Sequence, residues 1–308
     1  MRTIRGLESY PSEARAAVVA LGVFDGVHLA HRAILAAAVG HALAAALAPV
    51  VCTFDPHPME VLQPGRAPAP LSSLDERLDL IAATGVQATL VLKFTPELAA
   101  MEPEAFVTGV LLGRLRACEV VVGFNHTFGR GARGDARLLR ELGERLGFAT
   151  HVVEPLVVDG VPVSSSEIRG ALGRGEVERA ARYLGRPYSV AGEVVEGAGR
   201  GRTLGFPTAN VRPERPVLVP PGVYACHAQG DDDAHSAVVN IGVRPTFGEH
   251  ELVIEAHLLD FTGSLYGRRV RLEFVARLRE EQKFQGAEAL REQIVRDIAA
   301  ARGLLVAR

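Results

Sequence analysis

Two histidines three residues apart, His28 and His31, stand where an apolar run gives way to a stretch of helical composition. The connecting turn adds candidates for nucleotide binding: Gly22, Phe24, Asp25 and Gly26. A helix N-terminus offers free amides and a positive dipole end to phosphate, and histidines at i and i+3 share a helical face. The stretch predicts a site for charge on an attacked nucleotide phosphate. A zinc pair or two hydrogen-bonded core histidines remain alternatives, which the strand, glycines and helix disfavour.

A second stretch suited to phosphate lies at 197–210, where glycines and arginines alternate. Backbone amides and guanidinium groups in such a loop can surround a phosphate, but the stretch lacks the GK[ST] ending of a Walker A loop. It is therefore another kind of phosphate-binding loop or a flexible linker. Further along, Glu255 and His257 share one face of an expected strand. A lone strand carboxylate is more often solvated than catalytic.

The elements that must position the first site are short apolar runs alternating with amphipathic stretches. Strands are expected at 16–21, 50–54, 88–92, 119–123 and 149–153. Helices are expected at 31–47, 74–83, 103–112 and 135–146. This α/β alternation predicts a parallel sheet covered by helices, with ligands bound beyond the carboxyl ends of its strands.

After residue 176 the pattern changes to β-branched, period-two segments separated by glycine- and proline-rich turns. The string at 185–187, GRP, indicates a boundary, so we expect domains at 1–186 and 187–308. Strands are expected at 189–195, 222–228, 237–241, 252–258 and 270–275. These are typical of an antiparallel barrel or sandwich, and apolar residues at helical spacing predict a closing helix over 285–302.

The composition restricts the partners. The chain has 308 residues, with 34 basic against 36 acidic side chains and a formal net charge of −2. Nucleic-acid binding usually leaves a basic footprint, so we expect small-molecule partners and neither nucleic acid nor a membrane. Three widely separated cysteines form no metal, redox or disulfide pattern, which indicates a reducing cytoplasm. The oligomeric state stays open between a monomer and a weak homo-oligomer.

Four motifs in the first half resemble those of the bacterial FAD synthetases, nucleotidyltransferases with an HxGH signature. They are GVFDGVHLAH at 22–31, FDPHP at 54–58, VGFNHTFG at 122–129 and SSSEIR at 164–169. The resemblance implies ATP contacts for Ser165 and Ser166, catalytic roles for His28, His31 and Arg169, and flavin contacts for Asp55, His57 and Asn125. Ser165 can also cap a following helix, and Arg169 presents a forked guanidinium to phosphate. One position departs from the signature, because Ala30 stands where the family has glycine.

Motifs in the second half resemble those of the riboflavin kinases. The most specific is GFPTAN at 205–210, and the segments 220–224, 240–248, 253–260 and 278–284 are similar to others of that family. The resemblance implies an ATP site formed by Gly199, Arg200, Gly205, Phe206, Pro207, Thr208 and Asn210. Thr208 and Asn210 would bind the Mg²⁺ of ATP through hard oxygen donors. Glu255 would be the catalytic base and Arg279 a flavin contact.

Together the motifs identify the chain as a member of the bacterial bifunctional riboflavin kinase/FMN adenylyltransferase family. This implies that the second domain phosphorylates riboflavin with ATP to FMN. The first would then join FMN to the AMP part of another ATP, giving FAD and pyrophosphate. Three alternatives remain: a riboflavin kinase with a weak or inactive first domain, suggested by Ala30; an adenylyl- or cytidylyltransferase for another small molecule; and a non-catalytic flavin-binding regulatory protein.

Overall fold

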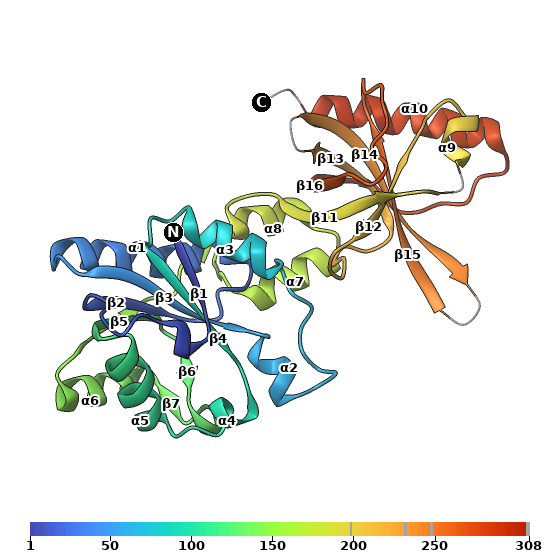
Figure 1. Cartoon of the computed structure of the whole chain (residues 1–308). Coiled ribbons are helices and arrows are strands. Elements are labelled where there is room, and N and C mark those ends of the chain that lie inside the picture. Colours follow the sequence, from blue (N-terminus) through green and yellow to red (C-terminus); the bar gives the residue numbers. More distant parts are fainter. Residues whose placement is uncertain (198, 231–232, 247–248, 306–308) are drawn as a thin grey trace. The chain divides into compact units, whose positions relative to one another are not determined.

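The computed structural model describes residues 1–197, 199–230, 233–246 and 249–305. It divides into two compact units, Met1–Ser165 and Ser166–Arg308 (Figure 1). The helices α7 (Ser165–Gly173) and α8 (Val177–Leu184) group almost entirely with the second unit by their contacts. The boundary between functional domains that the sequence places at 186/187 stays a prediction. Among the described residues, no helix is both long and apolar enough to cross a membrane.

The first unit is built on a six-stranded sheet in the order β1-β4-β3-β2-β5-β8, and every neighbouring pair is parallel. The strands are β1 (Arg2–Arg5), β2 (Ala17–Leu21), β3 (Ala48–Asp55), β4 (Ala88–Lys93), β5 (Ala117–Gly123) and β8 (Ala149–Val153). All five strands expected from the sequence are present. The edge strand β1 was not predicted, because only Ile4 of its four residues is buried and the segment has no apolar run.

Helices cover both faces of this sheet, as Figure 1 shows. The helices α1 (Leu29–Ala44) and α3 (Leu74–Ala82) pack on one face, and α5 (Pro103–Phe106), the π-helix η3 (Val107–Arg114) and α6 (Ala136–Leu146) pack on the other. Burial on both faces explains why β2 consists only of buried apolar residues. The expected helix at 103–112 is corrected to a short α-helix that continues as a π-helix.

Short elements complete the first unit. They are η1 (Leu7–Ser9), η2 (Asp25–Val27), α2 (Pro58–Leu62), α4 (Pro96–Ala99), β6 (Thr127–Phe128), η4 (Arg130–Ala132), β7 (Gly134–Asp135), β9 (Val157–Val158) and β10 (Val161–Pro162). The pairs β6–β7 and β9–β10 form two small antiparallel hairpins. None of these was predicted, because segments of two to five residues show no hydrophobic period.

The second unit contains a closed antiparallel barrel in the order β11-β12-β15-β14-β13-β16, which decides between barrel and sandwich. Its strands are β11 (Tyr188–Val195), β12 (Ala209–Pro213), β13 (Gly222–Gln229), β14 (Ala234–Thr246), β15 (Glu249–Leu258) and β16 (Arg269–Arg279). The strand β12 was missed because its polar sequence has no clear alternation. Tyr188, Tyr224 and Phe274 are fully buried and pack their rings together. The predicted closing helix is α10 (Ala287–Leu304), which packs on β13, β14 and β16.

Two candidate active sites

The first candidate site is the turn η2 between β2 and α1. Phe24, Gly26 and Val27 adopt left-handed φ angles of 55°, 75° and 39°. Such a backbone is strained for a β-branched residue such as Val27 and persists only where the surroundings hold it. Both side chains are almost fully buried, Phe24 at 1% and Val27 at 0% exposure. The turn is therefore held in one conformation by its packing.

Hydrogen bonds from distant segments also hold this turn. The carboxylate of Asp25 accepts the N–H of Leu71 at 3.0 and 3.1 Å and that of Ser72 at 3.3 Å. The N–H of Gly26 donates to Ser72 Oγ at 3.2 Å, and Ser165 Oγ donates to the carbonyl of Asp25 at 3.2 Å. Asp25 was predicted to contact ATP, and the structure shows its carboxylate binding backbone amides. It shapes the turn that precedes the histidines.

His28 and His31 lie in contact, but His28 does so as the N-cap of α1 and not on its helical face. Its Nδ1 accepts the N–H of His31 at 3.3 Å, and the two rings stack with centroids 3.5 Å apart. Burial, followed by the nearby His28 and Arg77, lowers the pKa of His31 well below its usual 6.5. The Nδ1 atom of His31 is buried and has no hydrogen-bond partner within the described residues. A buried nitrogen of this kind is expected where a ligand completes the hydrogen bond.

Arg77 belongs to the same region and was missed in the sequence. It lies on α3, is 6% exposed, and donates to the carbonyls of Val23 at 2.9 Å and Phe54 at 3.0 Å. Its guanidinium also lies 3.9 Å from the carboxylate of Asp55. Arg77 thereby joins the carboxyl ends of β2 and β3. The available signal was its position four residues before Ile81, on the buried face of the predicted helix.

The predicted flavin contacts of the first unit lie on either side of this turn. Asp55 ends β3, and Asn125 is exposed just after β5. Since β3, β2 and β5 are neighbours, their carboxyl ends meet at one edge of the sheet. His57 caps α2, because its Nδ1 accepts the N–H of Met59 at 3.1 Å. The structure therefore brings Asp55 and Asn125 to the sheet edge that carries the histidines.

His126 lies next to Asn125 and is a further histidine of this region, half-buried as a residue. Burial lowers its pKa to about 4, and its Nε2 is sealed without a partner in the described part of the chain. Its ring stacks on Phe128 at 5.9 Å. Two other predicted residues, Ser166 and Arg169, follow on α7 and belong to the second unit.

The second candidate site is a row of polar residues on the outer face of the barrel. In the register of three adjacent strands, Glu255 on β15 lies opposite Asn210 on β12 and opposite Asn240 on β14. The neighbours Ile254 and Ala256 are buried inside the barrel, so the predicted alternation of β15 is confirmed. Antiparallel register therefore sets two amides beside one carboxylate. Asn240 had been noted only as part of a longer motif.

The glycine-rich loop closes on this row. Gly197 lies so close to the amide of Asn210 that a Cβ would collide with it, and a Cβ on Gly201 would come 3.1 Å from Thr208 Oγ1. The N–H of Phe206 donates to the carbonyl of Gly201 at 2.8 Å. These contacts explain the glycines, because no side chain fits there. Gly199 and Gly205 have φ angles of 66° and 87°, which also favour glycine.

The same loop is attached to β15 by His257. Its Nδ1 lies 2.8 Å from the carbonyl of Pro207, and its ring meets that of Phe206 edge-on at 5.7 Å. The sequence had indicated only that His257 shares a face with Glu255. The backbone of Arg200 begins α9 (Arg200–Thr203). The Arg200 side chain and residues 247–248 of the predicted 240–248 motif lie outside the described part of the chain.

The oxygen donors here fit a magnesium ion. Thr208 and Asn210 stand two residues apart where the chain enters β12, with Glu255 opposite Asn210. Hydroxyl, amide and carboxylate oxygens are the ligands that Mg²⁺ prefers. The tight approach of Gly197 and Gly201 to these two side chains forms a cradle that a Cβ would fill.

Arg279, the predicted flavin contact of the barrel, has a different partner. It ends β16 and binds Asp297 of α10, with Nη2 to Oδ2 at 2.9 Å and both side chains largely buried. Its guanidinium also packs over the ring of Phe284 at 5.6 Å. Glu281, two residues after Arg279, approaches the strand that carries Asn240. A Cβ atom added to Gly242 would lie 3.0 Å from the carboxylate of Glu281. Flavin binding by Arg279 stays a prediction.

Comparison with known proteins matches each half of the chain to a family. Residues 10–167 match the FAD synthetase family, and residues 184–305 match the riboflavin kinase family. A bifunctional riboflavin kinase/FMN adenylyltransferase from Pseudomonas fluorescens is 39% identical over 99% of this chain and 98% of its own length. The chain belongs to this bifunctional family. The protein of the same description from Bacillus subtilis is 38% identical over 92% of this chain and 91% of its own.

Membership of the bifunctional riboflavin kinase/FMN adenylyltransferase family confirms the resemblance found in the sequence. The turn with His28 and His31 lies in the FAD synthetase domain, and the row containing Glu255 lies in the riboflavin kinase domain. A solved structure described as a macrolide-efflux protein from Streptococcus pneumoniae has a TM-score of 0.91 and 28% identity. It covers 98% of this chain and 99% of its own, so the order of the two folds is shared over the full length.

Proposed function

We propose that this chain makes FAD from riboflavin in two steps. The barrel phosphorylates riboflavin with ATP to give FMN and ADP. The first unit joins FMN to the AMP part of a second ATP and releases pyrophosphate. The observation that carries the proposal is that each of the two matched domains holds a separate polar site. A bifunctional relative that combines both domains in one chain matches this chain over nearly its full length.

In the kinase step, Glu255 accepts the proton of the riboflavin 5′-hydroxyl as its oxygen bonds to the γ-phosphorus. The bond from that phosphorus to the β-phosphate oxygen breaks and ADP leaves. Asn210 and Asn240, on the strands at either side, orient the carboxylate. Mg²⁺ held by Thr208 and Asn210 would neutralise phosphate charge. The loop containing Gly199, Gly205 and Pro207 positions the nucleotide against this row.

In the adenylyl transfer, an oxygen of the FMN phosphate attacks the α-phosphorus of ATP, and the bond to the β-phosphate oxygen breaks. The protein supplies no nucleophile, so its role is alignment and charge stabilisation. A neutral His31 and the adjacent His28 donate hydrogen bonds to phosphate oxygens at the N-terminus of α1. Arg169 is proposed to add a cation, and Asp55, His57 and Asn125 to contact FMN.

We also propose what the enzyme binds and where it acts. Its partners are riboflavin, FMN, ATP and Mg²⁺, with no role for nucleic acid, and it acts in the cytoplasm, where ATP is available. The oligomeric state stays open between a monomer and a weak homo-oligomer.

The test is to incubate the purified chain with riboflavin, excess ATP and Mg²⁺ and to follow flavins by chromatography. FMN that rises and then gives way to FAD supports both steps. FMN without FAD points to a weak first domain, the alternative suggested by Ala30. Ala30 lies in the first turn of α1, where alanine fits a helix. Ala30→Gly would then restore FAD formation, whereas Ala36→Gly, on the exposed face of the same helix, would not. Flavin binding without ATP turnover would overturn the proposal.

A further inference from the structure

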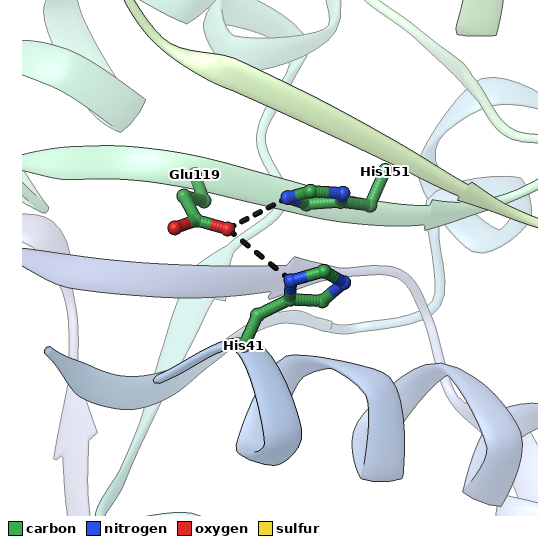
Figure 2. A group of neighbouring side chains, drawn as sticks. All are labelled: His41, Glu119 and His151. Carbon is green, nitrogen blue, oxygen red and sulfur yellow. Dashed lines mark hydrogen bonds and ion pairs between the residues drawn. The ribbon is translucent and has the colours of Figure 1, made fainter. Parts of the chain in front are cut away.

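Three side chains that the proposed chemistry does not use converge near the C-terminal end of α1. They are His41 of α1, Glu119 of β5 and His151 of β8 (Figure 2). One oxygen of Glu119 lies 2.6 Å from His151 Nε2 and 3.5 Å from His41 Nδ1. The two imidazole rings stack with centroids 3.6 Å apart. Two rings thus face the same carboxylate oxygen.

This cluster is separate from the proposed adenylyl-transfer site. His41 follows His31 by ten residues on α1, which places them roughly 15 Å apart along the helix. Glu119 is the third residue of β5, near its amino end, whereas the turn η2 follows the carboxyl end of β2. The cluster therefore lies toward the amino ends of the parallel strands, whereas the proposed adenylyl-transfer site lies at their carboxyl ends.

We propose that His41, Glu119 and His151 bind one transition-metal dication of the Zn²⁺ class. Two imidazole nitrogens and one carboxylate oxygen suit zinc and its neighbours in the first transition row better than Mg²⁺. The three donor atoms lie within 4.8 Å of one another. Tetrahedral zinc with bonds of about 2.1 Å places its donors roughly 3.4 Å apart. The His41–Glu119 distance of 3.5 Å already matches this separation, and the His151–Glu119 pair needs to open by less than about 1 Å.

The burial of the three side chains leaves room for a further ligand. Their exposed fractions are 40% for His41, 18% for Glu119 and 30% for His151. Solvent can therefore reach the cluster and complete a coordination shell that has three protein ligands. A bound ion would join α1 to β5 and β8. Because binding to the folded state stabilises it, the metal would stabilise the first unit.

A simple ion pair is the competing interpretation. Glu119 lies within ion-pair distance of both His151 and His41, and the two rings stack, so these contacts could exist without a metal. Either ion pair can form without the other imidazole, whereas a metal site needs both. Metal affinity therefore separates the two interpretations, because only a metal site depends on all three side chains.

The experiment is equilibrium dialysis of the full chain against Co²⁺ without nucleotide, with visible absorption reporting the coordination. We expect one Co²⁺ per chain, displaced by Zn²⁺, with the spectrum of a four-coordinate site. Loss of an outer-sphere partner typically weakens metal binding about 10–100-fold, so loss of a direct ligand in His41→Ala or His151→Ala should cost at least about 100-fold. Glu119→Gln, which conserves size, guards against misfolding of the alanine variants.

Two control variants locate the ion. His227→Ala on β13 removes a histidine of the other unit, and His28→Ala removes one from the proposed adenylyl-transfer site; both should bind Co²⁺ as the unaltered chain does. Binding that survives in Glu119→Gln and His151→Ala, or that is lost in His28→Ala, would overturn the proposal. So would the lack of stoichiometric binding by the unaltered chain.

Discussion

The first candidate site lies among buried side chains at the carboxyl ends of parallel strands, whereas the second lies on the outer face of an antiparallel barrel. Around the first, His31 and His126 have lowered pKa values, and Arg77 is buried against backbone carbonyls. Around the second, register alone sets Asn210, Glu255 and Asn240 side by side. The barrel interior beneath them is filled by separate residues.

This difference links structure to stability in two ways. In the first unit the candidate groups also close the turn η2 and cap α1, so altering them affects folding together with chemistry. In the second unit the core consists of Tyr188, Tyr224, Phe274 and their neighbours, and Glu255 is not part of it. Substitutions at the barrel site should therefore change activity with little change in stability.

The largest effect is expected for Glu255→Gln. Loss of a general base lowers rates by about 10²–10⁴-fold, so riboflavin phosphorylation should fall by that order. FAD formation from supplied FMN, and the melting temperature, should stay near those of the unaltered chain. Glu273→Gln replaces another partly exposed carboxylate on the barrel and is the matched control. Unchanged riboflavin phosphorylation in Glu255→Gln would remove this residue from the mechanism.

The next effect is expected for His28→Ala. Loss of one preorganised donor to a phosphate should lower FAD formation by roughly 10²–10³-fold. Loss of the N-cap should also destabilise the chain by about 1 kcal/mol, which distinguishes this site from the barrel site. Pyrophosphate release from FMN and ATP measures the first effect, and denaturant unfolding the second. An equal fall in riboflavin phosphorylation would contradict the assignment of the two domains.

Arg77→Met should lower the stability of the first unit, because Arg77 binds backbone carbonyls and is not one of the proposed substrate contacts. The carbonyl of Phe54 would lose a buried donor, at a cost of about 1–3 kcal/mol, whereas that of Val23 would keep the hydrogen bond from Thr53 Oγ1 at 2.9 Å. Urea unfolding measures the loss. Arg77→Lys keeps the charge but not the forked geometry, so it should recover part of the stability. The exposed Arg5→Met is the control, and a loss of similar size there would contradict the role of Arg77.

The smallest effect is a loss of stability in mild acid. The ring of folded His126 has a pKa of about 4, whereas an unfolded histidine has one near 6.5. Between these values the unfolded chain binds more protons, so stability falls as the pH drops below 6.5. From pH 7 to 5.5 this amounts to about 1 kcal/mol for His126, and His31 acts in the same direction. His126→Phe should show a shallower pH dependence, and an unchanged slope would contradict the buried neutral ring.

Much of the fold was predictable because its signals are local. The five predicted strands of the sheet, β2, β3, β4, β5 and β8, and the helices α1, α3 and α6 come from long apolar or amphipathic runs. Strands such as β1 and β12 are short and lack such runs, so only their pairing with neighbours defines them. The π-helix η3 lies in a segment with helical composition, and periodicity does not distinguish it from an α-helix.

The residues of the candidate sites also divide into those with a local sequence signal and those that only contacts between distant segments define. The sequence by itself determined two domains of different type, and spacing and family motifs predicted His28, His31, Thr208, Asn210 and Glu255 as site residues. Only the tertiary structure decided that Arg77 holds the ends of β2 and β3, that Arg279 binds Asp297, and that Asn240 flanks Glu255. It also brought His41, Glu119 and His151 together. Motifs record neighbours along the chain, whereas these contacts depend on strand register and helix packing between distant segments.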